Sequence, residues 1–162
     1  MLARTRNLAI ALVWLATGCA SNDLRVGTSH DPLTAFPSSA TFGWDRERIR
    51  MPSDDRIARL DLPTHLERIL ADELGARGYR LVDSGPTDFR ISYQLTTRSV
   101  MSDKPFATAS LSIRMNDGKE RQVWVGFAIA EIHVDLPQPE RSARLRNVVQ
   151  QMLENFPPRS DS

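Results

Sequence analysis

The sequence has little cysteine, little net charge and no long apolar run. One cysteine in 162 residues excludes a disulfide within the chain. The formal net charge is +1 and basic residues are not interleaved with aromatic ones, so we expect no nucleic-acid partner. No stretch approaches the ~20 apolar residues that cross a bilayer, which excludes a multi-pass membrane protein. A composition of 41% hydrophobic and 25% charged residues is that of a single globular domain.

Recognisable catalytic and metal-binding patterns are also missing. His30, His65 and His133 lack metal-ligand spacing, so we expect no metal and no cofactor. The chain has no Gly-x-Ser-x-Gly elbow, no P-loop and no Gly-x-Gly-x-x-Gly. Asp54 and Asp55 are neighbours in a charged segment, which favours solvated side chains over a catalytic pair. No catalytic residue is therefore predicted.

Residues 1–18 have the pattern of a bacterial signal peptide. Arg4 and Arg6 form a basic start, and an apolar run of nine residues, 8–16, follows that is too short to span a bilayer. Leu15-Ala16-Thr17-Gly18-Cys19 resembles the lipobox of bacterial lipoproteins, with Ala16 where leucine is usual. Lipidation explains both the position and the uniqueness of Cys19. Cleavage by ordinary signal peptidase, with Cys19 incidental, is the alternative.

A lipidated Cys19 would attach the mature chain to a membrane. One acyl chain holds a protein only marginally, whereas bacterial lipoproteins carry two or three chains, such as palmitate, on this cysteine. No aspartate follows Cys19, and aspartate there favours inner-membrane retention in enteric bacteria. We therefore expect a lipoprotein of the outer membrane that faces the periplasm, with the inner membrane as the alternative.

The remaining chain divides into three parts. Residues 19–35 are expected to form the lipidated N-terminus and a polar tether, with room for a short strand at 24–26. At full extension, the ~14 polar residues of this tether reach at most ~50 Å. Residues 36–158 are expected to form a single domain, and residues 159–162 a loose tail.

Two segments of the domain have the apolar spacing of amphipathic helices. Residues 62–78 carry Pro63 in the expected first turn and Gly78 at the expected end. Residues 140–156 carry a continuous apolar stripe, and Pro157 follows them. Between Asp45 and Arg59 the chain is charged, which is typical of a solvated loop.

Alternating apolar and polar residues predict the strands. Three long strands are expected at 89–96, 109–115 and 123–130, and shorter ones at 40–44 and 79–83. Asn116-Asp117-Gly118-Lys119 is a hairpin signal between the last two long strands. The elements together predict an α+β two-layer sandwich, a mainly antiparallel sheet with two amphipathic helices on one face.

One candidate binding surface lies on the sheet face away from the helices. The alternation turns the odd positions of 123–129 toward the core and places Trp124 opposite, on the face that carries Arg90 and Gln94. These three residues form the candidate site. Packing of Trp124 against its own chain is the alternative.

A second candidate lies on the first helix, where Glu73 and Arg77 fall within the apolar arc, one turn apart. A partly buried pair there could hold a partner or a loop. The alternative is an ordinary i,i+4 ion pair at the edge of the core, worth a few tenths of a kcal/mol.

Six short motifs follow one another along the mature chain: Phe36, Thr41 to Trp44, Ala71 to Arg80, Asp88 to Tyr93, Val123 to Gly126, and Phe156 to Pro158. Over about residues 24–158 this series resembles the bacterial lipoproteins of domain-of-unknown-function family 4136. The resemblance implies an envelope lipoprotein with a small α+β domain, and it implies no activity. The glycine- and tyrosine-rich insert often seen between the first two long strands is short here.

These observations favour a lipid-anchored, non-catalytic binding or assembly module with an envelope protein as a possible partner. Two alternatives stay open. A small-molecule or lipid carrier needs a cavity between helices and sheet, which the well-filled apolar stripes argue against. An unrecognised envelope hydrolase needs titratable residues clustered in a cleft.

Overall fold

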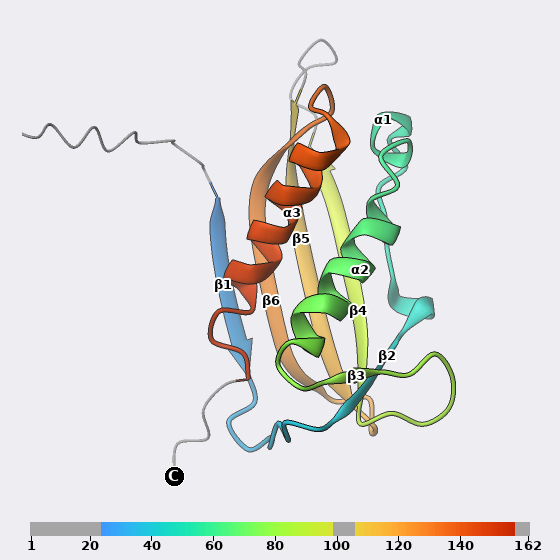
Figure 1. The fold of residues 1–162 in the computed structure, drawn as a ribbon, viewed down its shortest axis with the longest axis vertical. Helices are drawn as coiled ribbons and strands as arrows, with labels where there is room; N and C mark the ends of the chain where they lie inside the picture. The colour runs from blue at the N-terminus through green and yellow to red at the C-terminus, as the bar shows by residue number, and fades with distance from the viewer. Residues whose placement is uncertain (1–23, 99–105, 158–162) are drawn as a thin grey trace, which may run out of the picture.

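The computed structural model describes residues 24–98 and 106–157 of the chain. A six-stranded sheet in the order β1-β6-β5-β4-β2-β3 forms one layer, and two long helices lie against one of its faces (Figure 1). The predicted α+β fold with a mostly antiparallel sheet is thus confirmed. Within the described residues, no helix has the length and apolar character needed to cross a membrane.

Three long antiparallel strands form the centre of the sheet: β4 (Phe89–Arg98), β5 (Phe106–Asp117) and β6 (Gln122–His133). The turn between β5 and β6 is fixed by Asp117. Its Oδ1 accepts hydrogen bonds from the backbone N–H groups of Lys119 at 2.9 Å and of Arg121 at 3.0 Å. An aspartate side chain that bonds the backbone ahead of it stabilises such a turn.

The edges of the sheet come from distant parts of the chain. Strand β1 (Arg25–His30) pairs antiparallel with β6. Strand β2 (Thr41–Trp44) pairs in parallel with β4, and the two-residue strand β3 (Arg80–Leu81) pairs in parallel with β2. Strand β1 thus lies within 19–35, the segment expected to be a tether. Val26 of this strand packs against the core, which holds the segment on the sheet.

The charged segment after β2 follows the edge of β4 instead of forming a plain loop. It contains a 3-10 turn, η1 (Arg46–Arg48), and a short helix, α1 (Asp55–Ala58). Between them the Arg50 N–H donates to the Tyr93 carbonyl at 3.0 Å, and the Leu95 N–H donates to the Arg50 carbonyl at 2.9 Å. These bonds satisfy backbone groups of β4 that β2 does not reach.

Helix α2 (Leu62–Gly75) and helix α3 (Gln138–Met152) lie at the predicted helical segments. Both end earlier than predicted, and α3 also begins two residues earlier. Gly78 takes a positive φ of 90°, which stops α2, and the Tyr79 N–H donates to the Leu74 carbonyl at 3.1 Å. The Leu153 N–H closes the last turn of α3 on the Val149 carbonyl at 2.9 Å.

The core lies between these helices and the sheet, and its aromatic part is concentrated at the end where α2 and α3 finish. The ring of Phe156 lies 5.4 Å, centroid to centroid, from each of the rings of Phe36, Tyr79 and Trp124. The Tyr79 hydroxyl is buried without a hydrogen-bond partner among the residues that the structure describes, and this burial raises its pKa.

Candidate functional site

The face of strand β6 that packs against the helices is the opposite of the one that the alternation predicted. Trp124 and Ala128 are 3% and 2% exposed and face α3, whereas Phe127 and Ile129 are 49% and 37% exposed on the outer face. At Gly126 an added Cβ would lie 2.5 Å from the Trp124 ring and 3.1 Å from the Met152 side chain. Met152 of α3 comes so close to β6 at Gly126 that only a glycine fits there, and the Trp124 ring occupies the space that this glycine leaves.

This reversal corrects the first candidate site. Trp124 packs against Phe156 with a centroid distance of 5.4 Å, so it belongs to the core of its own chain. Arg90 and Gln94 alternate with buried residues of β4 and therefore lie across the sheet from it. The alternative interpretation, packing of Trp124 against its own chain, describes the structure, and the prediction of a binding surface centred on Trp124 is wrong.

The outer face carries an apolar strip whose residues were expected to face the core. We call Val125, Phe127 and Ile129, successive outward residues of β6, the outer strip. The ring of Phe127 lies over Gly27 of β1, where an added Cβ would be 2.3 Å from the ring. Both long helices lie on the other face of the sheet (Figure 1), so neither covers this strip.

The Glu73–Arg77 pair holds a loop of its own chain. Arg77 Nη1 donates to Glu73 Oε2 at 3.2 Å. The same guanidinium donates from Nε to the Phe156 carbonyl at 3.2 Å and from Nη2 to the Leu153 carbonyl at 3.1 Å. These carbonyls follow α3, where no further helical turn can bond them. Of the two predicted roles, holding a loop describes this pair.

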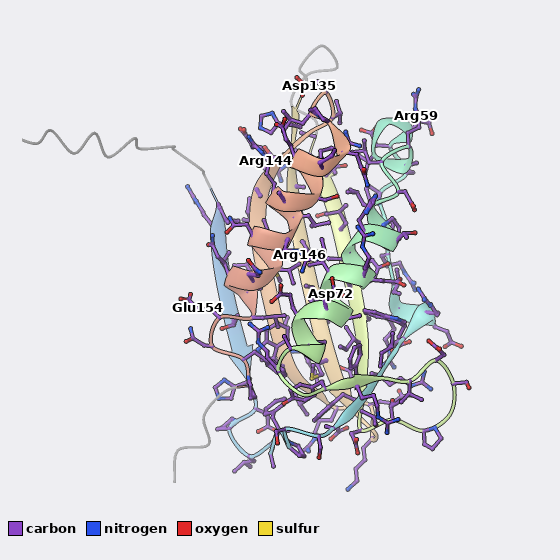
Figure 2. All side chains as sticks on the ribbon, in the orientation of Figure 1. Arg59, Asp72, Asp135, Arg144, Arg146 and Glu154 are labelled. Atoms are coloured by element: carbon purple, nitrogen blue, oxygen red, sulfur yellow. The ribbon has the colours of Figure 1, made fainter. Side chains whose placement is uncertain are left out.

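Glu73 also joins the two helices. Its Oε1 accepts hydrogen bonds from Gln150 at 2.8 Å and from Arg146 at 3.2 Å, and Arg146 also donates to Asp72 at 2.8 Å. Figure 2 shows Arg146 and Asp72 between α3 and α2. Burial acts to raise the pKa of Glu73, but hydrogen bonds from Gln150, Arg77 and Arg146 outweigh it and lower the pKa below its ordinary 4.5. We call the cluster of Asp72, Glu73, Arg146 and Gln150 the helix clamp.

An apolar cavity of about 90 Å³ lies between the first halves of the two helices and the sheet. Leucine and valine side chains of α2 and α3 form one wall, and Ala109, Ala128 and Ala130 form part of the sheet wall. Polar residues, among them Glu131 and Arg144, also line it. This cavity was not predicted from the sequence. The only signal for it was small alanines opposite large leucines, a pattern that close packing also produces.

A match to a family model shows which protein family the chain belongs to. The model named Domain of unknown function (DUF4136) matches residues 26–158. The chain belongs to the DUF4136 family. No curated protein matches its sequence.

Solved structures show where the fold of this DUF4136 chain recurs. A PelC dodecamer from Paraburkholderia phytofirmans superimposes with a TM-score of 0.58 at 11% identity, over 84% of this chain and 99% of that one. A point variant of the same dodecamer gives 0.55 at 12% identity, over 80% and 94%. The lipoprotein GNA1162 from Neisseria meningitidis gives 0.45 at 13% identity, over 72% and 99%. At these identities the likeness to the two PelC structures shows the fold alone, and no argument rests on the lower score of GNA1162.

Several titratable groups of this DUF4136 domain take part in hydrogen bonds or ion pairs. The Tyr93 hydroxyl donates to Glu67 Oε1 at 2.8 Å, Arg46 pairs with the same oxygen, and burial with the bond to Glu67 raises the pKa of Tyr93. His65 lies 3.2 Å from the Gln138 amide, and His133 lies 3.4 Å from Glu131.

Over 24–98 and 106–157, no three residues among His, Cys, Asp and Glu are grouped to hold a metal ion. Cys19, the predicted lipid attachment site, lies outside the described residues.

Proposed function

We propose that this DUF4136 protein is a lipid-anchored, non-catalytic assembly module of the bacterial cell envelope, held at the outer membrane and facing the periplasm. The basic and apolar start of the chain and Cys19 support the anchor. The observation that carries the assembly role is the outer strip, three apolar side chains on a sheet face that neither long helix covers. Exposed apolar patches rimmed by polar residues mark protein contacts.

The partner proposed for the outer strip is a further copy of the same chain. Both PelC structures that share the fold are described as dodecamers, which supports association of such domains with themselves. A patch present on every copy also permits a closed, symmetric assembly. Arg114, exposed on the neighbouring strand β5, and Arg90, exposed on β4 beyond it, give the strip the polar rim of a protein interface.

Photo-crosslinking in cells tests this role. Phe127 is replaced by the photoreactive p-benzoylphenylalanine in the full-length lipoprotein, which keeps an aromatic side chain at the centre of the strip. Illumination should produce covalent dimers and larger oligomers of the chain. The same residue at exposed position 154, just after the end of α3, is the control and should give none.

The products at position 127 separate the possible outcomes. A crosslink to a different envelope protein, identified by mass spectrometry, would keep the docking surface and overturn self-association. Equal products at 127 and 154, or none at 127, would remove the outer strip as a docking site.

A carrier of a small molecule or lipid is the second candidate, because the cavity supplies what a carrier requires. Its volume of about 90 Å³ is well below the ~300–1,000 Å³ of ordinary ligand pockets, so it ranks after assembly. Native mass spectrometry of the purified lipoprotein tests it, and a co-purifying small molecule of constant mass would reverse the order.

A further inference from the structure

The apolar cavity lies at the end of the molecule where the chain enters the sheet. Strand β1 begins with Arg25 paired to Ile129 and Val26 paired to Ala128, and Ala128 is part of the cavity wall. Helices α2 and α3 begin at this end, and β4 and β6 finish there (Figure 1). The entry of the chain and the cavity therefore share one end, opposite the aromatic cluster.

The predicted lipid attachment site is close to this end in sequence. Cys19 precedes Leu24 by five residues. An extended chain covers at most ~3.6 Å per residue, so Cys19 lies within about 20 Å of the start of β1. Neighbouring strands are ~4.8 Å apart, so the cavity wall on β6, β5 and β4 is one to three strands away from β1, roughly 5–15 Å. An acyl chain on Cys19 has the cavity within its range.

The lining of the cavity suits an unbranched hydrocarbon. The side chains of Met51, Leu62, Leu145 and Val148 line it and remain only half-buried, so apolar surface at its walls stays accessible. The cavity has a volume of about 90 Å³ and mostly apolar walls, and apolar cavities take up apolar ligands. The last few carbons of an acyl chain fill such a space.

We propose that the end of one acyl chain attached to Cys19 occupies this cavity in the same molecule. The proposal rests on the lipid anchor of the proposed function. Covalent attachment a few residues away gives this chain a high effective concentration at the cavity, which a free membrane lipid lacks. The remaining acyl chains on Cys19 stay in the bilayer and keep the protein attached.

A photoreactive fatty acid tests the proposal on the native sequence. Cells producing the full lipoprotein are grown with a fatty acid that carries a terminal diazirine, so that the label enters the acyl chains on Cys19. After illumination and proteolysis, mass spectrometry should find the Cys19 peptide joined through the acyl chain to peptides of α3 and β6. The same link should form in dilute detergent solution, as expected for a contact within one molecule.

Two matched variants show whether the link depends on the cavity. Ala130→Leu enlarges a side chain of the cavity wall and should reduce the linked peptide at least tenfold. Ala143→Leu makes the same change at an exposed position of α3 and should leave it unchanged. Equal yields in the two variants would overturn the proposal.

The same spectra separate the inference from the proposed function. Acylated Cys19 without a link to α3 or β6 would overturn the cavity assignment and leave the anchor intact. Links from phospholipid to the cavity peptides, without the Cys19 peptide, would assign the cavity to membrane lipid and overturn the proposal. Unmodified Cys19 would overturn both the anchor and the inference.

Discussion

Trp124 shows how one residue depends on the size of its neighbours. The indole fits beneath the end of α3 because Gly126, two residues along the same strand, has no side chain where the ring lies. Phe127, on the same strand, has its ring on the outer face over Gly27. Two large aromatic residues of one strand thus have opposite environments.

Truncation should separate these two aromatic residues. Trp124→Ala should lower the free energy of unfolding by about 3–5 kcal/mol, because it leaves a cavity in the core. Phe127→Ala, at a half-exposed position, should cost less than about 1.5 kcal/mol. Urea denaturation of the purified lipoprotein measures both, and a smaller loss for Trp124→Ala than for Phe127→Ala would contradict this placement.

Glu73 should make stability depend on pH. Its pKa in the folded protein is below the ordinary 4.5, so its contribution is fully present above about pH 4.5 and is lost as pH falls through the lowered pKa. Glu73→Gln should cost about 1–3 kcal/mol at pH 7, and this difference from the native protein should shrink as the pH drops below 4. Urea unfolding across pH 3–7 measures the effect.

Glu154→Gln is the control for this pH series. Glu154 is exposed just after α3 and is not part of the helix clamp. Its replacement should change the unfolding free energy by less than about 0.5 kcal/mol at every pH. A pH dependence of Glu73→Gln no larger than that of this control would remove the clamp as its cause.

At the scale of elements, the end of α3 depends on a side chain from α2. Arg77→Met should free the Leu153 and Phe156 carbonyls, and a hydrogen bond to a charged group is worth about 1.5–3 kcal/mol. Hydrogen exchange of the Leu153 and Phe156 amides should therefore accelerate tenfold or more. Arg80→Met, on the exposed strand β3, should leave those amides unchanged, and similar rates in the two variants would contradict the role of Arg77.

The elements that local spacing determines were predictable from the sequence. The helical stripes of α2 and α3 and the alternation of β4, β5 and β6 were recognised within a few residues. The parallel edge was not, because it depends on partners far apart in the chain. The Asp88 carboxylate accepts from the Thr41 N–H at 2.7 Å and from its hydroxyl at 2.8 Å, across 47 residues.

The candidate site was less predictable than the fold for a related reason. Alternation fixes which residues of β6 share a face, and it does not say which face meets the helices. Apolar residues on the odd positions favoured the wrong face, and only the close approach of α3 at Gly126 decides between them. The Glu73–Arg77 pair was predictable from its spacing on one helix. The loop that it holds was not, because the residues after α3 are far away in the sequence.

At the scale of the whole molecule, the two ends differ. One end carries the aromatic cluster and the helix clamp, and the other carries the cavity and the entry of the chain. Figure 2 shows Arg144 on α3 in the half where that helix begins, and the β5–β6 turn at Lys119 lies at the opposite end. If Cys19 is the anchor, the cavity end faces the membrane.

This orientation can be measured as a distance. A strand of 12 residues, the length of β6, spans about 40 Å, so fluorophores at positions 144 and 119 should differ clearly in energy transfer to an acceptor in the membrane. We expect strong transfer from position 144 and weak transfer from position 119 in the lipoprotein reconstituted in vesicles. Equal transfer from both positions would contradict a fixed orientation.

The antiparallel pairing of β1 with β6 also determines how the domain bears mechanical load. A pull on the chain ahead of Leu24, directed away from the cavity end, acts along the axis of β1. The six residue pairs from Arg25–Ile129 to His30–Trp124 then resist together in shear and cannot open one at a time, as they would if the strand were peeled sideways. The edge strand thus transmits force between the N-terminus and the rest of the domain through all six residue pairs at once.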